Sequence, residues 1–253
     1  MRIDVFSLIP ETITPYLGAS IIGKAREANK LEVVTHQIRD YASDKHSMTD
    51  DLPYGGGGGM VMKPEPIFSA VESVLAEAIT TTPIILLTPQ GRLFDQTVAA
   101  NLAELPRLTL ICGRYEGVDE RVRQHLATDE LSIGDYVLTG GELPALVVID
   151  AIARLIPGVL GDETAAANDS HQGGVLEHPH YTRPAEFRGW PVPEILRSGD
   201  HGAVDDWRRR QSLRRTFLRR PELLLEAELS EQDRIWLQQL KEEGKRGSLN
   251  DEG

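Results

Sequence analysis

The chain has a single cysteine and no long apolar run. Cys112 has no second thiol to pair with among the 253 residues, which excludes an internal disulfide. No stretch reaches the roughly 18 uncharged apolar residues that a membrane span needs. The start, Met1-Arg-Ile-Asp4, lacks the charged and apolar regions of a signal peptide. We therefore expect a cytoplasmic protein that contacts no membrane.

Positive charge is scarce and unevenly distributed. Lys and Arg total 27 against 39 Asp and Glu, and the net charge of −12 disfavours a nucleic-acid partner. The segment 207–220, however, holds seven arginines and no acid. On a helix, Arg208, Arg215 and Arg219 share one stripe and Arg209 adjoins it. The stripe is either a solvated face or a phosphate-binding face, and the absence of acids favours RNA.

Short apolar runs alternate with helical patterns in the first two thirds of the chain. The runs are too dense for one-sided strands and are typical of parallel strands buried on both faces. They cover 3–9, 31–38, 84–87 and 108–112, with helices expected at 11–24, 64–78 and 94–105. In such α/β sheets ligands bind at the carboxyl ends of strands. The loops after Leu87, after Cys112 and around Gly134 should therefore converge.

Two glycine-rich stretches are candidates for functional loops. Gly55–Gly59 is not followed by Gly-Lys-Ser/Thr, so it is no P-loop; it is either a linker or a loop beside a pocket. The chain also lacks G-x-G-x-x-G after its first strand, which disfavours an ordinary dinucleotide site. Gly134, Gly140 and Gly141 lie within eight residues, and such a backbone approaches a flat ligand closely.

An almost entirely apolar helix is expected at 143–156. Pro144 opens it, and only Asp150 and Arg154, four residues apart, interrupt its apolar surface. Such a helix must be covered on most sides, which a sheet together with a partner subunit would do.

Six motifs, in order, closely resemble the signatures of the bacterial tRNA (guanine-N1)-methyltransferase family. They are Asp4-Val-Phe-Ser-Leu-Ile-Pro10, Tyr54-Gly-Gly-Gly-Gly-Gly-Met60, Cys112-Gly-Arg-Tyr-Glu-Gly-Val-Asp-Glu-Arg121, Ser132-Ile-Gly-Asp-Tyr-Val-Leu-Thr-Gly-Gly-Glu-Leu-Pro144, Pro179-His-Tyr-Thr-Arg-Pro184 and Leu218-Arg-Arg-Pro-Glu-Leu223. The resemblance implies an α/β, mostly parallel sheet with a deep trefoil knot at about 85–160, followed by a small all-α domain. It also implies a homodimer whose active site lies between subunits.

The reaction implied by the resemblance is transfer of a methyl group from S-adenosylmethionine (SAM) to N1 of the guanosine immediately 3′ of the anticodon. Removing the N1 proton requires a base, and charge gathering on O6 requires a cation. Asp169 aligns with the family's proposed base and Arg154 with its catalytic arginine, with Glu116 as the second candidate base. Without the resemblance, Asp169 would be a solvated carboxylate and Arg154 a partner of Asp150.

The resemblance also assigns binding residues. Those expected to hold SAM are Leu87, Pro89, Gly113, Tyr115, Ile133, Gly134, Asp135, Tyr136, Val137, Leu138, Gly140 and Gly141. Those expected to bind tRNA are Arg183, Arg208, Arg209, Arg215 and Arg219. The family is associated with Mg²⁺, which Glu116, Asp169 and Glu177 would attract through water. No direct metal ligands are expected, because His178 and His180 have no thiol or second spaced ligand pair beside them.

The expected domains are a SAM-binding knotted domain at 1–160, a flexible linker at 161–174, a helical tRNA-binding domain at 175–246 and a disordered tail at 247–253. Two other functions fit the same sequence. One is a methyltransferase of the same knotted class that modifies ribose or ribosomal RNA, and the other is an RNA-binding protein without catalysis.

Overall fold

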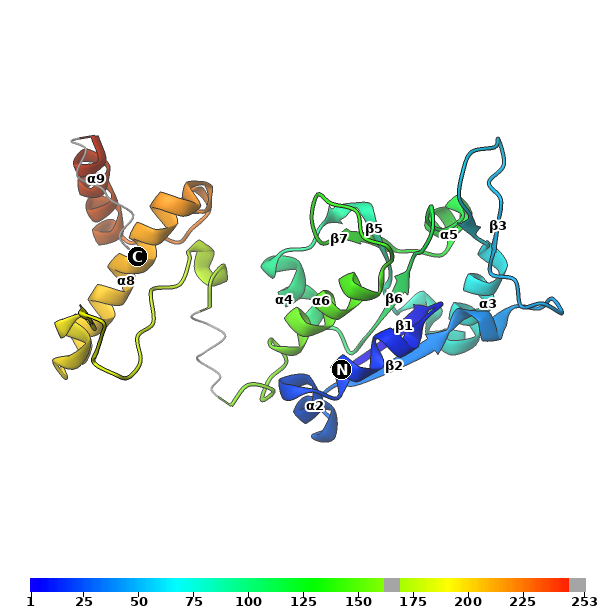
Figure 1. Cartoon of the computed structure of the whole chain (residues 1–253), viewed down its shortest axis with the longest axis horizontal. Coiled ribbons are helices and arrows are strands. Elements are labelled where there is room, and N and C mark those ends of the chain that lie inside the picture. Colours follow the sequence, from blue (N-terminus) through cyan, green and yellow to red (C-terminus); the bar gives the residue numbers. More distant parts are fainter. Residues whose placement is uncertain (162–168, 246–253) are drawn as a thin grey trace. The chain divides into compact units, whose positions relative to one another are not determined.

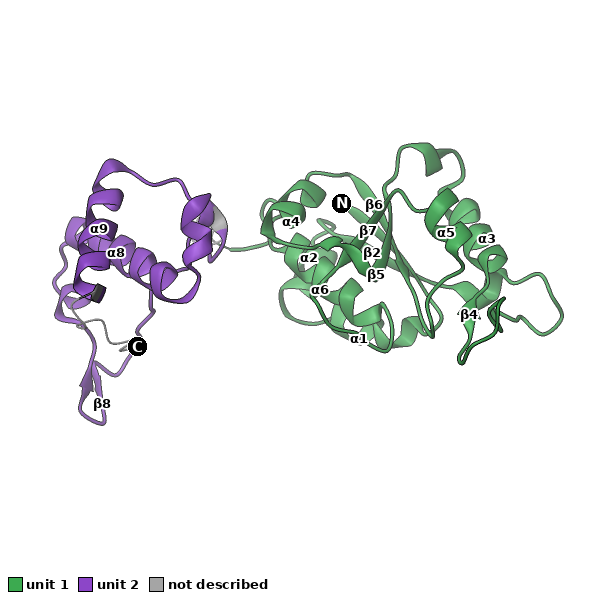
Figure 2. Ribbon diagram, turned by 90° about the horizontal axis from the view of Figure 1, so that it is seen from above, with its two compact units in different colours: residues 1–162 green, residues 163–253 purple. Residues whose placement is uncertain are grey.

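The computed structural model describes residues 1–161 and 169–245, which belong to two compact units (Figures 1 and 2). Unit 1 is Met1–Asp162 and unit 2 is Glu163–Gly253, so the division falls within the expected linker. Part of that linker, 162–168, and the expected tail, 247–253, lie outside the described residues.

Unit 1 is built on a five-stranded parallel sheet with the order β2-β1-β6-β5-β7 (Figure 1). The strands are β1 (Arg2–Ser7), β2 (Glu32–Gln37), β5 (Ile84–Leu93), β6 (Arg107–Cys112) and β7 (Asp129–Ser132). Two short strands, β3 (Asp50–Asp51) and β4 (Val61–Met62), form a separate antiparallel pair. The four strands expected from apolar runs are confirmed.

Helices cover both faces of this sheet (Figures 1 and 2). One face packs against α1 (Thr14–Leu17), α2 (Ser20–Glu27), α4 (Gln96–Ala103) and α6 (Glu142–Ala153). The other packs against α3 (Pro64–Leu75) and α5 (Glu120–His125). Because neighbouring residues such as Leu86 and Leu87 contribute to opposite cores, both must be apolar. The expected α/β class with a parallel sheet is confirmed.

Two local expectations differ from the structure. The single helix expected at 11–24 is divided into a 3₁₀ turn (Pro10–Thr12), α1 and α2, and Gly23 packs so closely on Gly18 that a Cβ atom would lie 2.5 Å from its carbonyl oxygen. Strand β7 was not expected, because Leu131 is its only large apolar residue. It is a strand because it pairs with β5, where a register shift lets both Leu87 and Arg92 pair with Leu131.

A buried carboxylate holds three strands together. Asp4 on β1 is fully buried and accepts hydrogen bonds from Arg2 at 2.9 Å and Arg107 at 2.8 Å, with His36 Nε2 also 2.8 Å away. Burial alone would raise the pKa of Asp4. The hydrogen bonds from His36, Arg2 and Arg107 outweigh it and hold this pKa well below its usual range.

Replacing Asp4 with asparagine is expected to lower the free energy of unfolding by about 3–5 kcal/mol at neutral pH, because two arginines lose a buried partner. Since the folded pKa is depressed, the carboxylate stabilises the protein above its unfolded pKa of about 4 and loses this effect as pH falls through the folded pKa. Urea unfolding at a series of pH values measures the difference. Equal stability of the two proteins at neutral pH would contradict it, and Asp51→Asn, an exposed change, is the control.

Unit 2 is a small helical unit. Its main helices, α8 (His201–Arg219) and α9 (Glu231–Lys245), pack around Val175, Leu213 and Leu237. A hairpin of β8 (Glu186–Phe187) and β9 (Trp190–Pro191) precedes them and was not expected. Short 3₁₀ turns lie in this unit at Gln172–Gly174, Glu194–Arg197 and Pro221–Leu225, and in unit 1 at Ile38–Tyr41 and Ala76–Thr80. Among the described helices of both units, none is long and apolar enough to cross a membrane.

Candidate functional site

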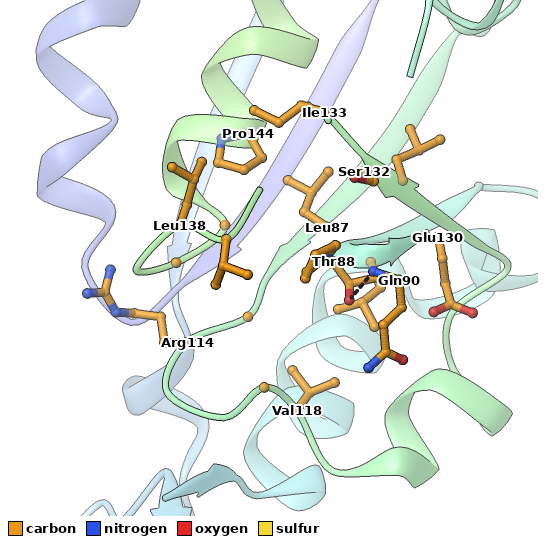
Figure 3. A pocket seen from close by; sticks show the side chains of 18 of the residues that line it. Leu87, Thr88, Gln90, Arg114, Val118, Glu130, Ser132, Ile133, Leu138 and Pro144 are labelled. Atoms are coloured by element: carbon orange, nitrogen blue, oxygen red, sulfur yellow. Dashed lines mark hydrogen bonds between the residues drawn. The ribbon is translucent and has the colours of Figure 1, made fainter. Parts of the chain in front are cut away.

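A cavity lies beside the middle of β5 and the ends of β6 and β7, and its volume of about 290 Å³ is near the lower limit of small-molecule sites. Its lining comes mainly from residues 86–90 of β5, the loop 113–118 and the segment 130–141 (Figure 3). The three loops expected to converge at the carboxyl edge of the sheet do so.

The structure brings together nearly all the residues expected to bind SAM. The cavity is lined by Leu87, Pro89, Gly113, Tyr115, Ile133, Gly134, Tyr136, Val137, Leu138, Gly140 and Gly141. Asp135 lies on the same loop but does not line the cavity. Thr88, Gln90, Glu130 and Ser132 also line it and were missed, the last two because β7 itself was missed.

Part of the cavity wall is apolar. Leu87, Ile133, Leu138 and Pro144 lie near one another, whereas Gln90 and Glu130 lie at the opposite end (Figure 3). Within the part of the chain that the structure describes, the backbone N–H groups of Val137 and Leu138 donate no hydrogen bond. An apolar slot edged by available backbone donors suits a flat heteroaromatic ring.

Two distant chain segments cross in contact beside the cavity. Gly141 donates its N–H to the carbonyl oxygen of Gly113 at 2.9 Å, and a Cβ atom at Gly141 would lie 2.6 Å from Cys112 Cα. Only glycine permits this approach, and the crossing lies within the region where the resemblance places the knot. Cys112 below it is fully buried, and burial raises the pKa of its thiol, so it is a packing residue rather than a nucleophile.

A buried carboxylate joins the cavity loop to the first turn of α6. Glu142 is 5% exposed; it accepts hydrogen bonds from Arg114 at 2.9 Å and from the Ser7 hydroxyl at 2.6 Å. The pair fixes the loop 113–118 against the helix. Arg114 and Glu142 lie inside the motifs recognised from sequence, but only the fold showed that they face each other.

The glycine loop ends beside the cavity. A Cβ atom at Gly59 would clash with the side chain of Glu116, and Glu116 donates its N–H to Met60 O at 3.0 Å. Met62 similarly donates to Gly117 O at 2.9 Å. Because Glu116 lines the cavity, these contacts favour the pocket-side interpretation of Gly55–Gly59 over a linker.

The three candidate catalytic residues occupy different places. Glu116 lines the cavity, whereas Arg154 caps the far end of α6 and borders a second cavity with Tyr16 and Asp150. Asp150 accepts a hydrogen bond from the Tyr16 hydroxyl at 2.5 Å. At 1.5 Å per residue, Arg154 is about 20 Å along the helix from Gly141. Asp169 belongs to unit 2.

The arginines expected to bind RNA divide into two groups. Arg209 pairs with Asp233 at 2.9 Å and thereby ties α8 to α9, and Arg215 donates to Glu177 O at 3.2 Å. Both therefore have structural partners inside unit 2. Arg208, Arg219 and Arg183 are exposed, and Arg208 has a solvent-exposed ion pair with Asp205 at 3.3 Å.

The fold and the site define an α/β protein with a small-molecule cavity beside the carboxyl ends of its parallel strands and a separate helical unit that carries an arginine-rich helix. The chain belongs to the tRNA (guanine-1)-methyltransferase TrmD family, whose family model matches residues 1–226.

Relatives named tRNA (guanine-N(1)-)-methyltransferase match almost the whole chain. One from Dehalococcoides mccartyi is 57% identical over 234 residues, covering 92% of this chain and 94% of the relative. One from Bacillus cereus is 52% identical over 242 residues, covering 96% of this chain and 99% of the relative. A relative from Bacillus anthracis matches to the same extent.

Proposed function

We propose that the protein transfers a methyl group from SAM to N1 of the guanosine immediately 3′ of the anticodon in tRNA. The observation that carries this proposal is the near full-length similarity to relatives named for guanine-N1 methylation of tRNA. The cavity between the loops 113–118 and 133–141 supports it, because its lining suits a cofactor with a flat base.

SAM, when bound, supplies an electrophilic methyl group on a sulfonium sulfur. Leu87, Ile133 and Leu138 are proposed to enclose its adenine ring, and the backbone of 137–138 to hydrogen-bond the ring edge. The Arg114–Glu142 pair positions the loop that forms the opposite wall. The residues present therefore fit the cofactor that the family implies.

The protein's own residues must handle one proton and one developing charge. Asp169 is proposed to accept the N1 proton of guanine, which makes N1 nucleophilic. Arg154 is proposed to stabilise the negative charge that gathers on O6. Glu116 is the alternative base, since it lines the cavity.

We also propose that the active protein is a homodimer. Arg154 lies about 20 Å along α6 from Gly141, which lines the cavity of the same chain. This is too far for Arg154 to contact a base bound in that cavity. Leu143 and Val147 on the same helix are 60% and 45% exposed, although the helix is almost wholly apolar. A two-fold pairing would cover these side chains and bring Arg154 of one subunit toward the cavity of the other.

Unit 2 is proposed to bind tRNA through exposed arginines. Arg208→Ala and Arg219→Ala are each expected to weaken binding of every tRNA alike and to lower the slope of log affinity against log salt by about one. Filter binding at a series of salt concentrations measures the slope, with the exposed Lys241→Ala on α9 as control. A change in which tRNA is preferred, with an unchanged slope, would instead indicate base recognition.

Transfer of labelled methyl groups to tRNA tests the proposed function directly. A transcript with guanosine 3′ of the anticodon should be labelled, and one with adenosine there should not. Nucleoside digestion should yield 1-methylguanosine. A methylated ribose would identify the knotted methyltransferase of other specificity, and no label would identify a non-catalytic RNA-binding protein. Repeating the assay with EDTA, and then with Mg²⁺ added back, tests whether Mg²⁺ takes part in the reaction.

A further inference from the structure

Three metal-ligating side chains of unit 2 lie together outside the cofactor cavity. One potential ligand atom from each of Glu177, His178 and His180 lies within 4.8 Å of the other two. Glu177 Oε1 is 2.7 Å from His180 Nε2, and the two imidazole rings are 4.6 Å apart between centroids. We propose that these three side chains bind one divalent transition-metal ion of the zinc type, with water in the fourth position.

The backbone that carries these ligands is already held in place. Leu176 donates its N–H to the Thr216 hydroxyl at 2.8 Å, and Glu177 donates to the Ser170 hydroxyl at 3.0 Å. Arg215 donates to Glu177 O at 3.2 Å. Pro179, between the histidines, restricts the remaining backbone freedom. Metal binding therefore has to order only side chains, which keeps its entropic cost small.

The separations suit a small tetrahedral ion after modest side-chain rotation. Zinc–nitrogen and zinc–oxygen distances of about 2.0–2.1 Å place tetrahedral ligand atoms roughly 3.3 Å from one another. The Glu177–His180 contact at 2.7 Å must open slightly, and the widest separation, within 4.8 Å, must close. Both changes are rotations about side-chain bonds.

The chemistry of the donor set selects the ion. Two imidazoles and one carboxylate suit zinc and its neighbours in the transition series, whereas Mg²⁺ prefers six oxygen ligands. The sequence contains the motif Glu-His-Pro-His without a thiol or a second ligand pair, and the third ligand is the carboxylate of Glu177 beside the histidines.

The site has a structural consequence for the neighbouring segment. The Glu177–Ser170 hydrogen bond connects it to the residue that follows Asp169. A bound ion would hold 177–180 rigidly and so restrict motion at 169–170. Metal binding at this site is independent of the proposed methyl transfer, since all three ligands belong to unit 2 and metal binding is measured without SAM or tRNA.

Metal titration of the full-length, metal-stripped protein tests the proposal. Co²⁺ should bind one ion per chain with the intense visible absorption of tetrahedral coordination, and stoichiometric Zn²⁺ should displace it. His178→Gln and His180→Gln should each weaken Zn²⁺ binding at least about tenfold, since even the partners of metal ligands contribute 10- to 100-fold. Circular dichroism verifies that the variants remain folded, and His201→Gln, an exposed histidine of the same unit, should bind normally.

Two results would overturn the proposal. Unchanged Zn²⁺ affinity in both histidine variants would show that the ion binds elsewhere. Bound Co²⁺ with the weak absorption of octahedral coordination, displaced by an equal concentration of Mg²⁺, would show an oxygen-ligand site instead.

Discussion

Asp169→Asn is expected to lower the single-turnover rate of methyl transfer by about 10²- to 10⁴-fold, the usual contribution of a general base. Asparagine keeps the shape of aspartate and still forms hydrogen bonds, but it cannot accept the N1 proton. SAM affinity should stay unchanged, because every residue that lines the cofactor cavity lies in unit 1 and Asp169 lies in unit 2. The loss should therefore appear in kcat rather than in binding.

Single-turnover methylation at saturating SAM, measured across pH, gives the rate, and calorimetry gives the SAM affinity. Glu116→Gln is the matched variant, because Glu116 is the carboxylate that lines the cavity. A wild-type rate that rises with pH, together with nearly full activity of Asp169→Asn, would contradict the assignment and place the base at Glu116.

Arg154→Ala is expected to reduce the same rate to a comparable extent, since loss of one donor to a developing oxyanion costs about 10²- to 10³-fold. If Arg154 serves the cavity of a partner subunit, the loss should be recovered in mixed dimers. The Arg154→Ala protein is mixed with a second variant, Leu138→Arg, which keeps Arg154 but places a cation in the proposed cofactor cavity. Leu138 is partly exposed, so the change should leave the fold intact.

In a mixed dimer, the intact cavity of the Arg154→Ala subunit meets the intact Arg154 of the Leu138→Arg subunit. Random mixing makes about half the dimers mixed, each with one of two sites complete, so roughly a quarter of wild-type activity should return. No recovery after verified subunit exchange would show that Arg154 acts within its own chain. Arg154→Ala with nearly full activity would remove it from catalysis and leave it a structural residue of α6.

Local sequence patterns predicted much of the α/β framework, because burial on both faces demands unbroken apolar runs. The buried runs in β1, β5 and β6 largely follow this rule, whereas β2 is an edge strand with a single buried residue. The segments after Leu87 and Cys112 do line one cavity, as the sequence predicted. Strand β7 was not predicted, because it forms by pairing with β5, a strand distant in the sequence. The cavity residues Glu130 and Ser132, which belong to β7, were therefore not predicted either.

The sequence also placed arginines on one stripe of α8, since helical periodicity depends only on spacing. It did not reveal that Arg209 pairs with Asp233, because that partner comes from α9, 24 residues later. The same limit applies to Glu142, whose partners Arg114 and Ser7 are 28 and 135 residues away.

The sequence by itself determined the family, the expected cofactor and the residue types available for chemistry. These follow from local motifs, and a motif is complete within a few consecutive residues. Only the tertiary structure decided which residues meet. It places Gly141 against Cys112, Gly59 against the side chain of Glu116, and Glu177 beside His180. The first two of these contacts depend on the path of the chain between their members, and the third depends on how the backbone of 177–180 is held by the rest of unit 2. The spacing of residues within a motif carries no information about the chain path or about how a backbone segment is held.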